Sequence, residues 1–278
     1  MTGRRLVINA DDFGMAAGVD EGIIEAAAAG SVSSVSVMTN LYDSDRLAVA
    51  IARLRAAAPE IGIGLHFNCL AGHPLTDAPT LIDRNTGEFL RLSSMLSRLV
   101  TGSASVGDVA RECEAQFEAL VAVAGTVSHV DSHLHVHTLP RFRPVFSALV
   151  GKHGVAHLRR PLESMRTNPF SVVASCKKLL VRAVWAVATA DEQSASDRRI
   201  HFAGFSLRGD HNLLARLMRF LDNLPLGVTE LMVHPGFVDP EARRYTRYVK
   251  GRDIERAVLT SVSVRRRLRQ GDIALTHF

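Results

Sequence analysis

The fold class is indicated most clearly by the stretch LVINADDFG, residues 6–14. A short apolar run that gives way to polar residues and a glycine is typical of a buried strand that ends in a loop. Asp11 and Asp12 therefore follow a predicted first strand. Two neighbouring carboxylates repel each other, and a bound metal ion usually relieves that repulsion, which leaves one carboxylate to hold the ion and the other to handle protons.

Similar apolar runs alternate with helical stretches along the chain, which favours parallel strands joined by crossover helices. Polar residues follow most of these runs, and in a (β/α) barrel the carboxyl ends of all strands meet at one mouth. No Gly-x-Gly-x-x-Gly motif follows the first strand. We therefore predict an α/β fold, namely a distorted (β/α) TIM-like barrel that can have fewer than eight regular βα units. This barrel is favoured over an open doubly wound sheet. The predicted strands are 6–9, 32–38, 61–65, 127–130, 155–158, 230–233 and 273–275, and the clearest predicted helices are 19–29, 45–58, 108–124, 142–152, 211–221 and 253–269.

The composition predicts one soluble domain over residues 1–278. The chain is 47% hydrophobic and has no low-complexity linker. Its three cysteines are widely spaced, which favours neither a disulfide framework nor a cysteine zinc knuckle and indicates a reducing cytoplasm. The N-terminal apolar run is too short for a signal peptide or a membrane span. The net charge is only +5, and no aromatic residues lie among the clustered arginines near the C-terminus. We therefore do not expect nucleic-acid binding.

Two stretches fit the alternation poorly. Residues 75–107 are expected to form a long loop over the barrel mouth. Residues 161–204 are expected to be an inserted helical and loop segment, with an amphipathic basic helix over 170–190. A helix packed on the barrel with its lysines in water is favoured over a membrane-facing element.

Histidines crowd into SHVDSHLHVH, residues 128–137, which holds four of the twelve histidines of the chain. Alternate residues of a strand point the same way, so Asp131, His133 and His135 can share one face. One or two of these imidazoles are candidates to bind a metal ion, and the others would orient the ligands or line the pocket. Apolar residues interleave with the histidines, which argues against a surface run.

Two further histidines follow other apolar runs. His66 stands in GLHFN, residues 64–68, and together with Asp12 and His133 offers one carboxylate and two imidazoles from three strand ends. Such a set leaves positions open for water and substrate, as hydrolytic metal sites need, and zinc, magnesium, manganese, cobalt or iron would fit it. His234, in MVHPGF, suits a general acid that protonates a leaving amine.

Four motifs resemble, in order, those of the YdjC-like carbohydrate deacetylases, a family that includes chitooligosaccharide deacetylases and a hopanoid-biosynthesis branch. These motifs are NADDFG at 9–14, GLHFN at 64–68, HVDSHLHVH at 129–137 and VHPG at 233–236. Weaker matches at residues 72–75 and at Glu112 with Gln116 extend the likeness over nearly the whole chain, apart from residues 161–204.

The resemblance implies a distorted (β/α) barrel that removes an N-acetyl group from an amino sugar with the help of one divalent metal ion. Mg and Zn are the favoured ions. By position, it implies that Asp12, His66 and His133 are the metal ligands. It also implies that Asp11 is the base that activates water and that His234 assists the departing amine. We expect four further residues at strand ends to contact the substrate: Asn68, Asp131, His135 and Arg160.

The substrate and two other functions stay open. The segment 161–204 departs from the compact chitooligosaccharide type and is closer to the hopanoid-associated branch, so the sugar could be lipid-linked and presented at a membrane surface. The His-x-His pair at 133 and 135 would also suit a binuclear amidohydrolase or phosphoesterase, but no lysine stands where such a site needs a bridging one. A non-catalytic sugar- or lipid-binding barrel is the other alternative. We expect a cytoplasmic homodimer.

Overall fold

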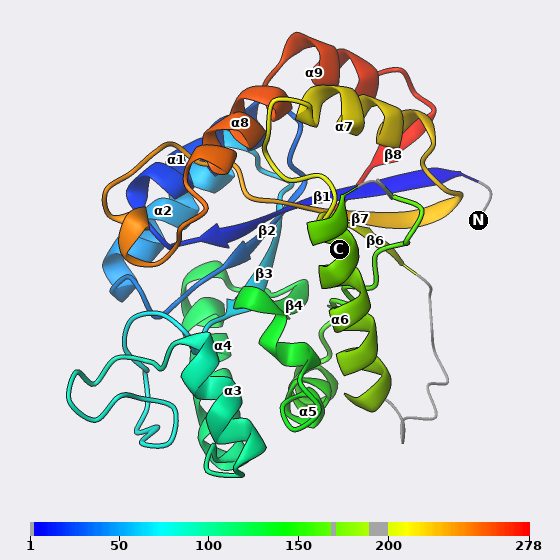
Figure 1. Ribbon diagram of the computed structural model, residues 1–278. Helices are drawn as coiled ribbons and strands as arrows, with labels where there is room; N and C mark the ends of the chain where they lie inside the picture. The colour runs from blue at the N-terminus through cyan, green and yellow to red at the C-terminus, as the bar shows by residue number, and fades with distance from the viewer. Residues whose placement is uncertain (1–2, 168–170, 189–199) are drawn as a thin grey trace.

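A computed structural model describes residues 3–167, 171–188 and 200–278, and it contains one curled parallel sheet (Figure 1). The strands lie in the order β5-β4-β3-β2-β1-β7-β6, and β8 pairs with the start of β1. A bridge between Glu163, which follows β5, and Phe202 in β6 brings the two edges of the sheet together. The predicted distorted (β/α) barrel is confirmed.

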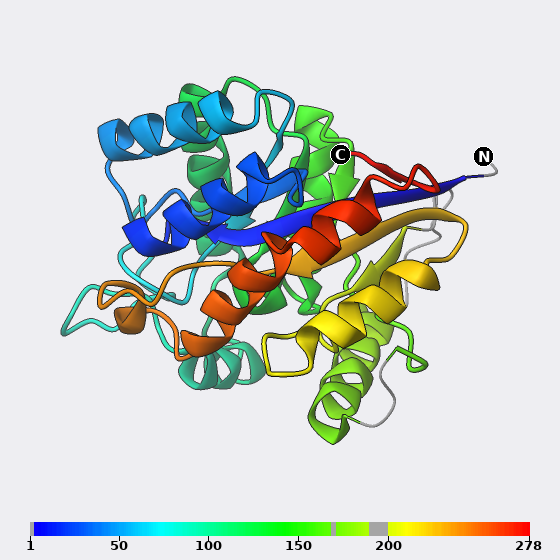
Figure 2. The same ribbon diagram turned by 90° about the horizontal axis from the view of Figure 1, so that it is seen from above.

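Helices cover the outside of the sheet, as Figure 2 shows around the long strand β1. The strands are β1 (Arg4–Phe13), β2 (Ser34–Val37), β3 (Gly62–Phe67), β4 (His129–Ser132), β5 (His157–Leu158), β6 (His201–Ala203), β7 (Gly227–Val233) and β8 (Ile273–Leu275). The helices are α1 (Ala17–Ala28), α2 (Ser44–Ala57), α3 (Leu92–Val100), α4 (Val106–Ala124), α5 (Arg143–His153), α6 (Val172–Ala188), α7 (Leu213–Asp222), α8 (Lys250–Leu259) and α9 (Val262–Leu268), with 3-10 turns η1 (His133–Thr138) and η2 (Ala242–Arg244).

Strand β1 lies in the middle of the sheet, where both of its faces are covered. It pairs with β2 and β7, and Leu6, Ile8 and Ala10 are fully buried. A parallel strand covered on both sides has a continuous apolar sequence, which is the pattern from which this strand was predicted. The strand thus fixes the polar residues at its end in the centre of the barrel.

The strands and loops differ from the prediction in three places. The first strand does not end at residue 9 but continues through Phe13, so both acids lie inside it. The expected loop at 75–107 contains the helix α3. Strand β6 is an additional strand that lies within the predicted inserted segment 161–204, near its end, and pairs with β7.

Two predicted helices have a different extent in the structure. The predicted helix 253–269 is divided into α8 and α9, because the Ser261 side chain accepts a hydrogen bond from the amide of Val264 and starts a new helix. The predicted helix 170–190 is present as α6, while residues 170, 189 and 190 lie outside the described residues.

A buried carboxylate holds the turn after β1. Asp20 accepts hydrogen bonds from the amide of Gly14 at 2.6 Å and from the Tyr42 hydroxyl at 2.9 Å. Burial nevertheless raises the pKa of Asp20 to about 7. Because this folded-state pKa lies above that of an unfolded aspartate, the group stabilises the fold below about pH 4, and this contribution is lost as the pH rises through about 7.

We therefore expect the Asp20→Asn variant to lack a pH dependence that the wild-type protein has. Between about pH 4 and pH 7 the unfolding free energy of the wild-type protein should fall, relative to the variant, by on the order of 4 kcal/mol. Asparagine can still accept from Gly14 and donate to Tyr42, so the local geometry is kept. Urea unfolding of both proteins at several pH values measures this difference, and parallel profiles would contradict the raised pKa.

Candidate active site

Asp11 and Asp12 lie at a β-bulge in β1. Between Ala10 and Phe13, β1 advances by three residues while β2 advances by only two. The extra residue is accommodated at Asp12, whose φ of 73° is in the left-handed region that residues with a side chain rarely adopt. Adjacent residues of a regular strand point to opposite faces. The bulge instead brings an oxygen of each carboxylate within 4.8 Å of a His66 ring nitrogen.

Asp12, His66 and His133 lie together in the structure. Oδ1 of Asp12 is 3.1 Å from Nε2 of His66 and 2.9 Å from Nδ1 of His133, and all three side chains are buried. The other oxygen of Asp12 accepts a hydrogen bond from the buried Arg252. One carboxylate oxygen and two imidazole nitrogens therefore face a common point.

His66 is oriented by the carboxylate on its far side. Its Nδ1 lies 2.6 Å from Oδ1 of Asp131, so Nδ1 donates and Nε2 is left to face Asp12. A carboxylate behind a histidine is the usual support of a metal ligand. Burial alone would lower the pKa of His66, but the charge of Asp131 and the hydrogen bonds to both aspartates raise it to about 10. The surroundings thus favour a positive charge at this position.

Arg159 is the centre of the buried charges. Its two terminal nitrogens lie 2.7 Å from the two oxygens of Asp11, and it also contacts Asp131 and Glu230 at 2.6 Å each. Arg159 itself is fully buried. Burial raises the pKa of Asp11, but the guanidinium more than offsets this and holds that pKa well below its usual value. Asp11 is thus ionised and fixed in place.

The charges of the cluster fit a divalent cation. Among the described residues, four buried carboxylates contact the two buried guanidinium groups of Arg159 and Arg252. When all are ionised, four negative and two positive charges leave an excess of two negative charges, of which a proton on His66 would offset one. A buried excess of this kind is costly unless a cation balances it. The four carboxylates are those of Asp11, Asp12, Asp131 and Glu230.

The donors favour one ion rather than two. A second group, Asp11 with His66 and Asp131, is also close enough to hold a metal ion. However, both carboxylates of this group contact the guanidinium of Arg159, which would repel a cation. Asp12 contacts Arg252 through one oxygen only, and its Oδ1 faces the two imidazoles. The group around Asp12 is therefore the better metal site.

His234 follows β7 and is held by a glutamate. The backbone amide of His234 donates to Glu255, and its Nδ1 lies 3.9 Å from Oε2 of the same carboxylate. Glu255 is buried and also accepts a hydrogen bond from the Tyr248 hydroxyl. Burial lowers the pKa of His234 to about 3, although Asp11 and Asp12 act to raise it. The imidazole is therefore neutral at pH 7 in this structure.

The four residues expected at the substrate lie in different surroundings. Asn68 and Asp131 are fully buried; Asn68 donates to Asn40 at 2.9 Å, and Asp131 supports His66. His135 is half-buried, in the left-handed conformation, with its ring 5.2 Å from that of Phe205. Arg160 lines a separate cavity. A contact of any of these residues with substrate stays a prediction.

Several groups of the site were not predicted from the sequence. Arg159 directly precedes Arg160, which was the residue predicted to contact the substrate. Only the pairing of β5 with β4 decides which of the two side chains points into the barrel. Arg252 and Glu255 lie on α8, outside every strand end, so no strand-end pattern could find them. Two small polar residues within strands were also missed, Asn9 and Ser36, which donate to Asp11 and Asp131 at 2.9 and 2.8 Å.

A parallel (β/α) barrel with aspartates and histidines gathered at its strand ends belongs to the class of barrel proteins whose function lies at that mouth. Residues 5–270 match the family model described as YdjC-like protein, so the chain belongs to the YdjC-like family. It is 34% identical to a carbohydrate deacetylase of Geobacillus stearothermophilus over 92% of this chain and 89% of that protein. It is 31% identical to a chitooligosaccharide deacetylase of Yersinia pestis over 98% of this chain and 97% of that protein.

A solved structure supports the fold. The protein from Enterococcus faecalis named for cellobiose-phosphate cleavage superposes with a TM-score of 0.72 at 24% identity, over 99% of this chain and 98% of that one. No helix in the described part of the chain has the length and hydropathy needed to cross a bilayer. The hopanoid-associated branch, the cytoplasmic location and the homodimer stay predictions.

Proposed function

We propose that this protein is a metal-dependent carbohydrate deacetylase that hydrolyses the N-acetyl group of an amino sugar. The observation that carries the proposal is the convergence of Asp12, His66 and His133 next to a separately held carboxylate, Asp11. The names of the relatives, carbohydrate deacetylase and chitooligosaccharide deacetylase, support the substrate class. We further propose that residues 1–278 act as one domain, with residues 161–204 as an insertion.

In the proposed mechanism the two adjacent aspartates have different tasks. A divalent ion held by Asp12, His66 and His133 would polarise the acetyl carbonyl and acidify a water molecule. Asp11 accepts the proton of the attacking water, and Arg159 keeps its carboxylate oriented for this step. Because its pKa is held low, Asp11 is ionised at neutral pH and needs no prior deprotonation.

His234 would complete the reaction at the leaving nitrogen. Its neutral imidazole takes up a proton from solvent and gives it to the departing amine, while Asp11 returns to solvent the proton that it accepted from water. The sugar leaves as a free amine and the acyl group as acetate, with one proton released. The carboxylate of Glu255 near Nδ1 stabilises the imidazolium formed on the way. The net reaction consumes one water molecule.

Removal of the metal is expected to abolish acetate release. After dialysis against a chelator, Zn, Mg, Mn, Co and Fe are added back separately, and at least one of them should restore turnover. Each protein sample is assayed with N-acetylglucosamine, with chitooligosaccharides and with a lipid-linked N-acetylglucosamine, and the compound that releases acetate identifies the substrate. Metal analysis should give one ion per chain. Two ions would favour the binuclear amidohydrolase or phosphoesterase, and sugar binding without acetate release from any substrate would favour the non-catalytic barrel.

A further inference from the structure

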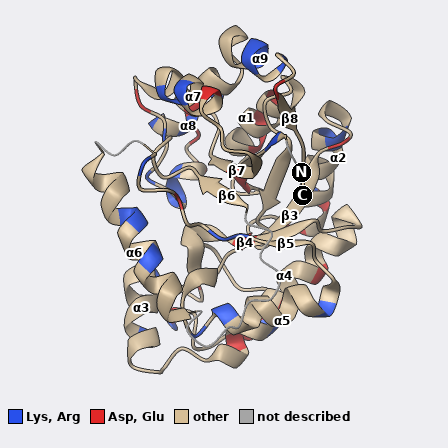
Figure 3. Cartoon of the chain, turned by 90° about the vertical axis from the view of Figure 1, so that its right-hand side faces the viewer, with Lys and Arg blue, Asp and Glu red and all other residues tan. Residues whose placement is uncertain are grey.

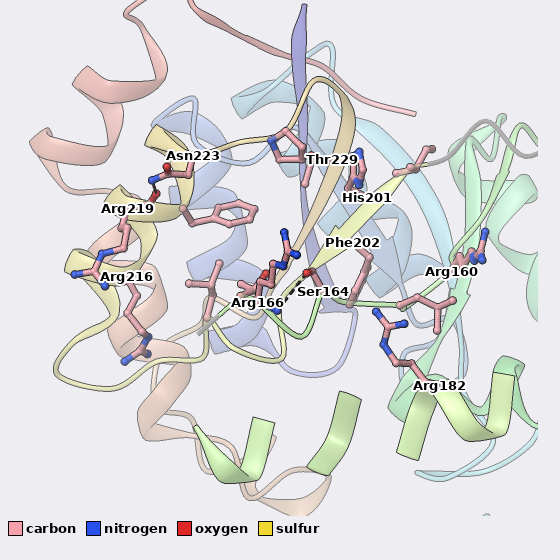
Figure 4. Close-up of a pocket in the computed structure, with 16 residues that line it drawn as sticks. Arg160, Ser164, Arg166, Arg182, His201, Phe202, Arg216, Arg219, Asn223 and Thr229 are labelled. Atoms are coloured by element: carbon pink, nitrogen blue, oxygen red, sulfur yellow. Dashed lines mark hydrogen bonds between the residues drawn. The ribbon is translucent and has the colours of Figure 1, made fainter. Parts of the chain in front are cut away.

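A cavity of about 1140 Å³ lies beside the barrel, apart from the candidate active site (Figure 4). It is lined by residues of α6, α7, β6 and the chain that follows β5. None of the proposed metal ligands lines it, and neither does Asp11 or His234. The ring of Phe202 forms part of its wall and lies 5.9 Å from the guanidinium carbon of Arg159. The cavity is therefore a neighbour of the buried charge cluster and not a part of it.

The described residues that line this cavity carry positive charge and no carboxylate. Arg216 is paired with Asp210 at 2.8 Å, outside the lining. Arg166, Arg182 and Arg219 form no ion pair with any carboxylate that the structure describes. Guanidinium groups match phosphate oxygens in pairs, so the cavity fits a phosphate-bearing anion. Figure 4 shows the arginines around it: Arg216 and Arg219 from α7 on one side, Arg160 and Arg182 on the other, and Arg166 between them.

Helix α6 presents an apolar stripe to the outside. Its buried face is formed by Ala174, Lys178 and Trp185. With 3.6 residues per turn, the exposed aliphatic side chains fall within an arc of about 120° on the opposite side. These side chains, each more than half exposed, are Val172, Val173, Leu179, Leu180 and Val187.

The apolar stripe and the arginine-lined cavity meet at Arg182. This residue lines the cavity and lies one turn after Leu179 of the stripe. Lys177 borders the stripe on its other edge, and Figure 3 marks basic positions along α6. A helix with an exposed aliphatic arc bordered by basic residues is suited to lie in the interface of an anionic bilayer.

We propose that α6 and the arginine-lined cavity dock on a membrane that contains anionic phospholipid. The aliphatic stripe enters the interface, and the cavity takes a phosphate headgroup. A bilayer explains both features, whereas a soluble anion would leave the five aliphatic side chains in water. This docking site is independent of the proposed deacetylase activity.

Vesicle binding by the full chain tests this proposal. Flotation with vesicles of phosphatidylcholine and phosphatidylglycerol should recover the protein, and pure phosphatidylcholine should recover much less. The double variant L179Q/L180Q should bind at least about tenfold more weakly, because two exposed aliphatic side chains no longer enter the interface. The matched control Val100→Gln removes an aliphatic side chain that is 89% exposed at the end of α3 and should bind as the wild-type protein does.

A second pair of variants tests the cavity. Arg166→Gln should weaken binding to the anionic vesicles about fivefold, and glycerol 3-phosphate should compete with the vesicles. Arg84→Gln removes the same charge from an exposed loop and should have little effect.

Three outcomes would overturn the proposal. The first is no binding of the wild-type protein to anionic vesicles, even where glycerol 3-phosphate binds. The second is an equal effect of the stripe and control variants. The third is a dimer that L179Q/L180Q dissociates without any vesicle binding, which would make a second copy of the chain the occupant of the stripe. Acetate release from a soluble sugar is measured separately and bears only on the deacetylase.

Discussion

Replacing Asp11 with asparagine is expected to lower kcat for acetate release by about 10²–10⁴-fold while the metal content stays unchanged. Asparagine has the shape of aspartate but cannot accept the proton of the attacking water. It can still accept from the Asn9 side chain, which donates to Asp11 at 2.9 Å. KM should change little, because Asp11 is not proposed to hold the substrate. Acetate release and metal analysis on the same preparation measure both quantities.

The neighbouring variant Asp12→Asn is the matched control. It makes the same chemical change one residue along the chain, but at the carboxylate that faces both histidines. We expect this variant to lose metal affinity as well as activity. Full turnover by the Asp11→Asn protein would show that another group is the base, and equal metal loss in both variants would contradict the division of tasks between the two aspartates.

Replacing Arg159 with alanine is expected to lower the free energy of unfolding by about 3–5 kcal/mol or more. The change leaves Asp11, Asp131 and Glu230 buried without the guanidinium that contacts all three. If this variant does not fold, Arg159→Lys should still fold with intermediate stability, because it retains the charge but not the fork of donors. Urea unfolding at pH 7, followed by circular dichroism, measures the effect.

Arg160→Ala is the matched control for this experiment. Arg160 is next in sequence but lies at the separate cavity, with its guanidinium carbon 5.8 Å from the Trp185 ring. Its loss should cost no more than about 1 kcal/mol. Similar stabilities of the two alanine variants would show that the buried carboxylates do not depend on Arg159.

The sequence allowed the fold class to be predicted because apolar runs and polar strand ends are local patterns. It also located Asp12, His66 and His133, each of which follows such a run. Strand β6 was missed because three residues carry too little periodicity, and α3 was hidden in a segment that looked like a loop.

The support of the site could not be predicted in the same way. Whether Arg159 or Arg160 turns inward depends on the register of β5, which is only two residues long. Arg252 and Glu255 reach the site from a helix far along the chain from Asp12, so only the tertiary structure brings them there. Local sequence patterns identify the proposed metal ligands better than the residues that hold them in place.

Because of the bulge in β1, the geometry of the site depends on the number of residues in this strand. Removing either Asp11 or Asp12, the two residues between Ala10 and Phe13, would restore regular pairing with β2 and would leave a single carboxylate at this end of the strand. An alignment would score such a deletion as one small gap with every motif residue but one still in place. For members of this family, the spacing of residues in this strand is therefore as informative as their identity.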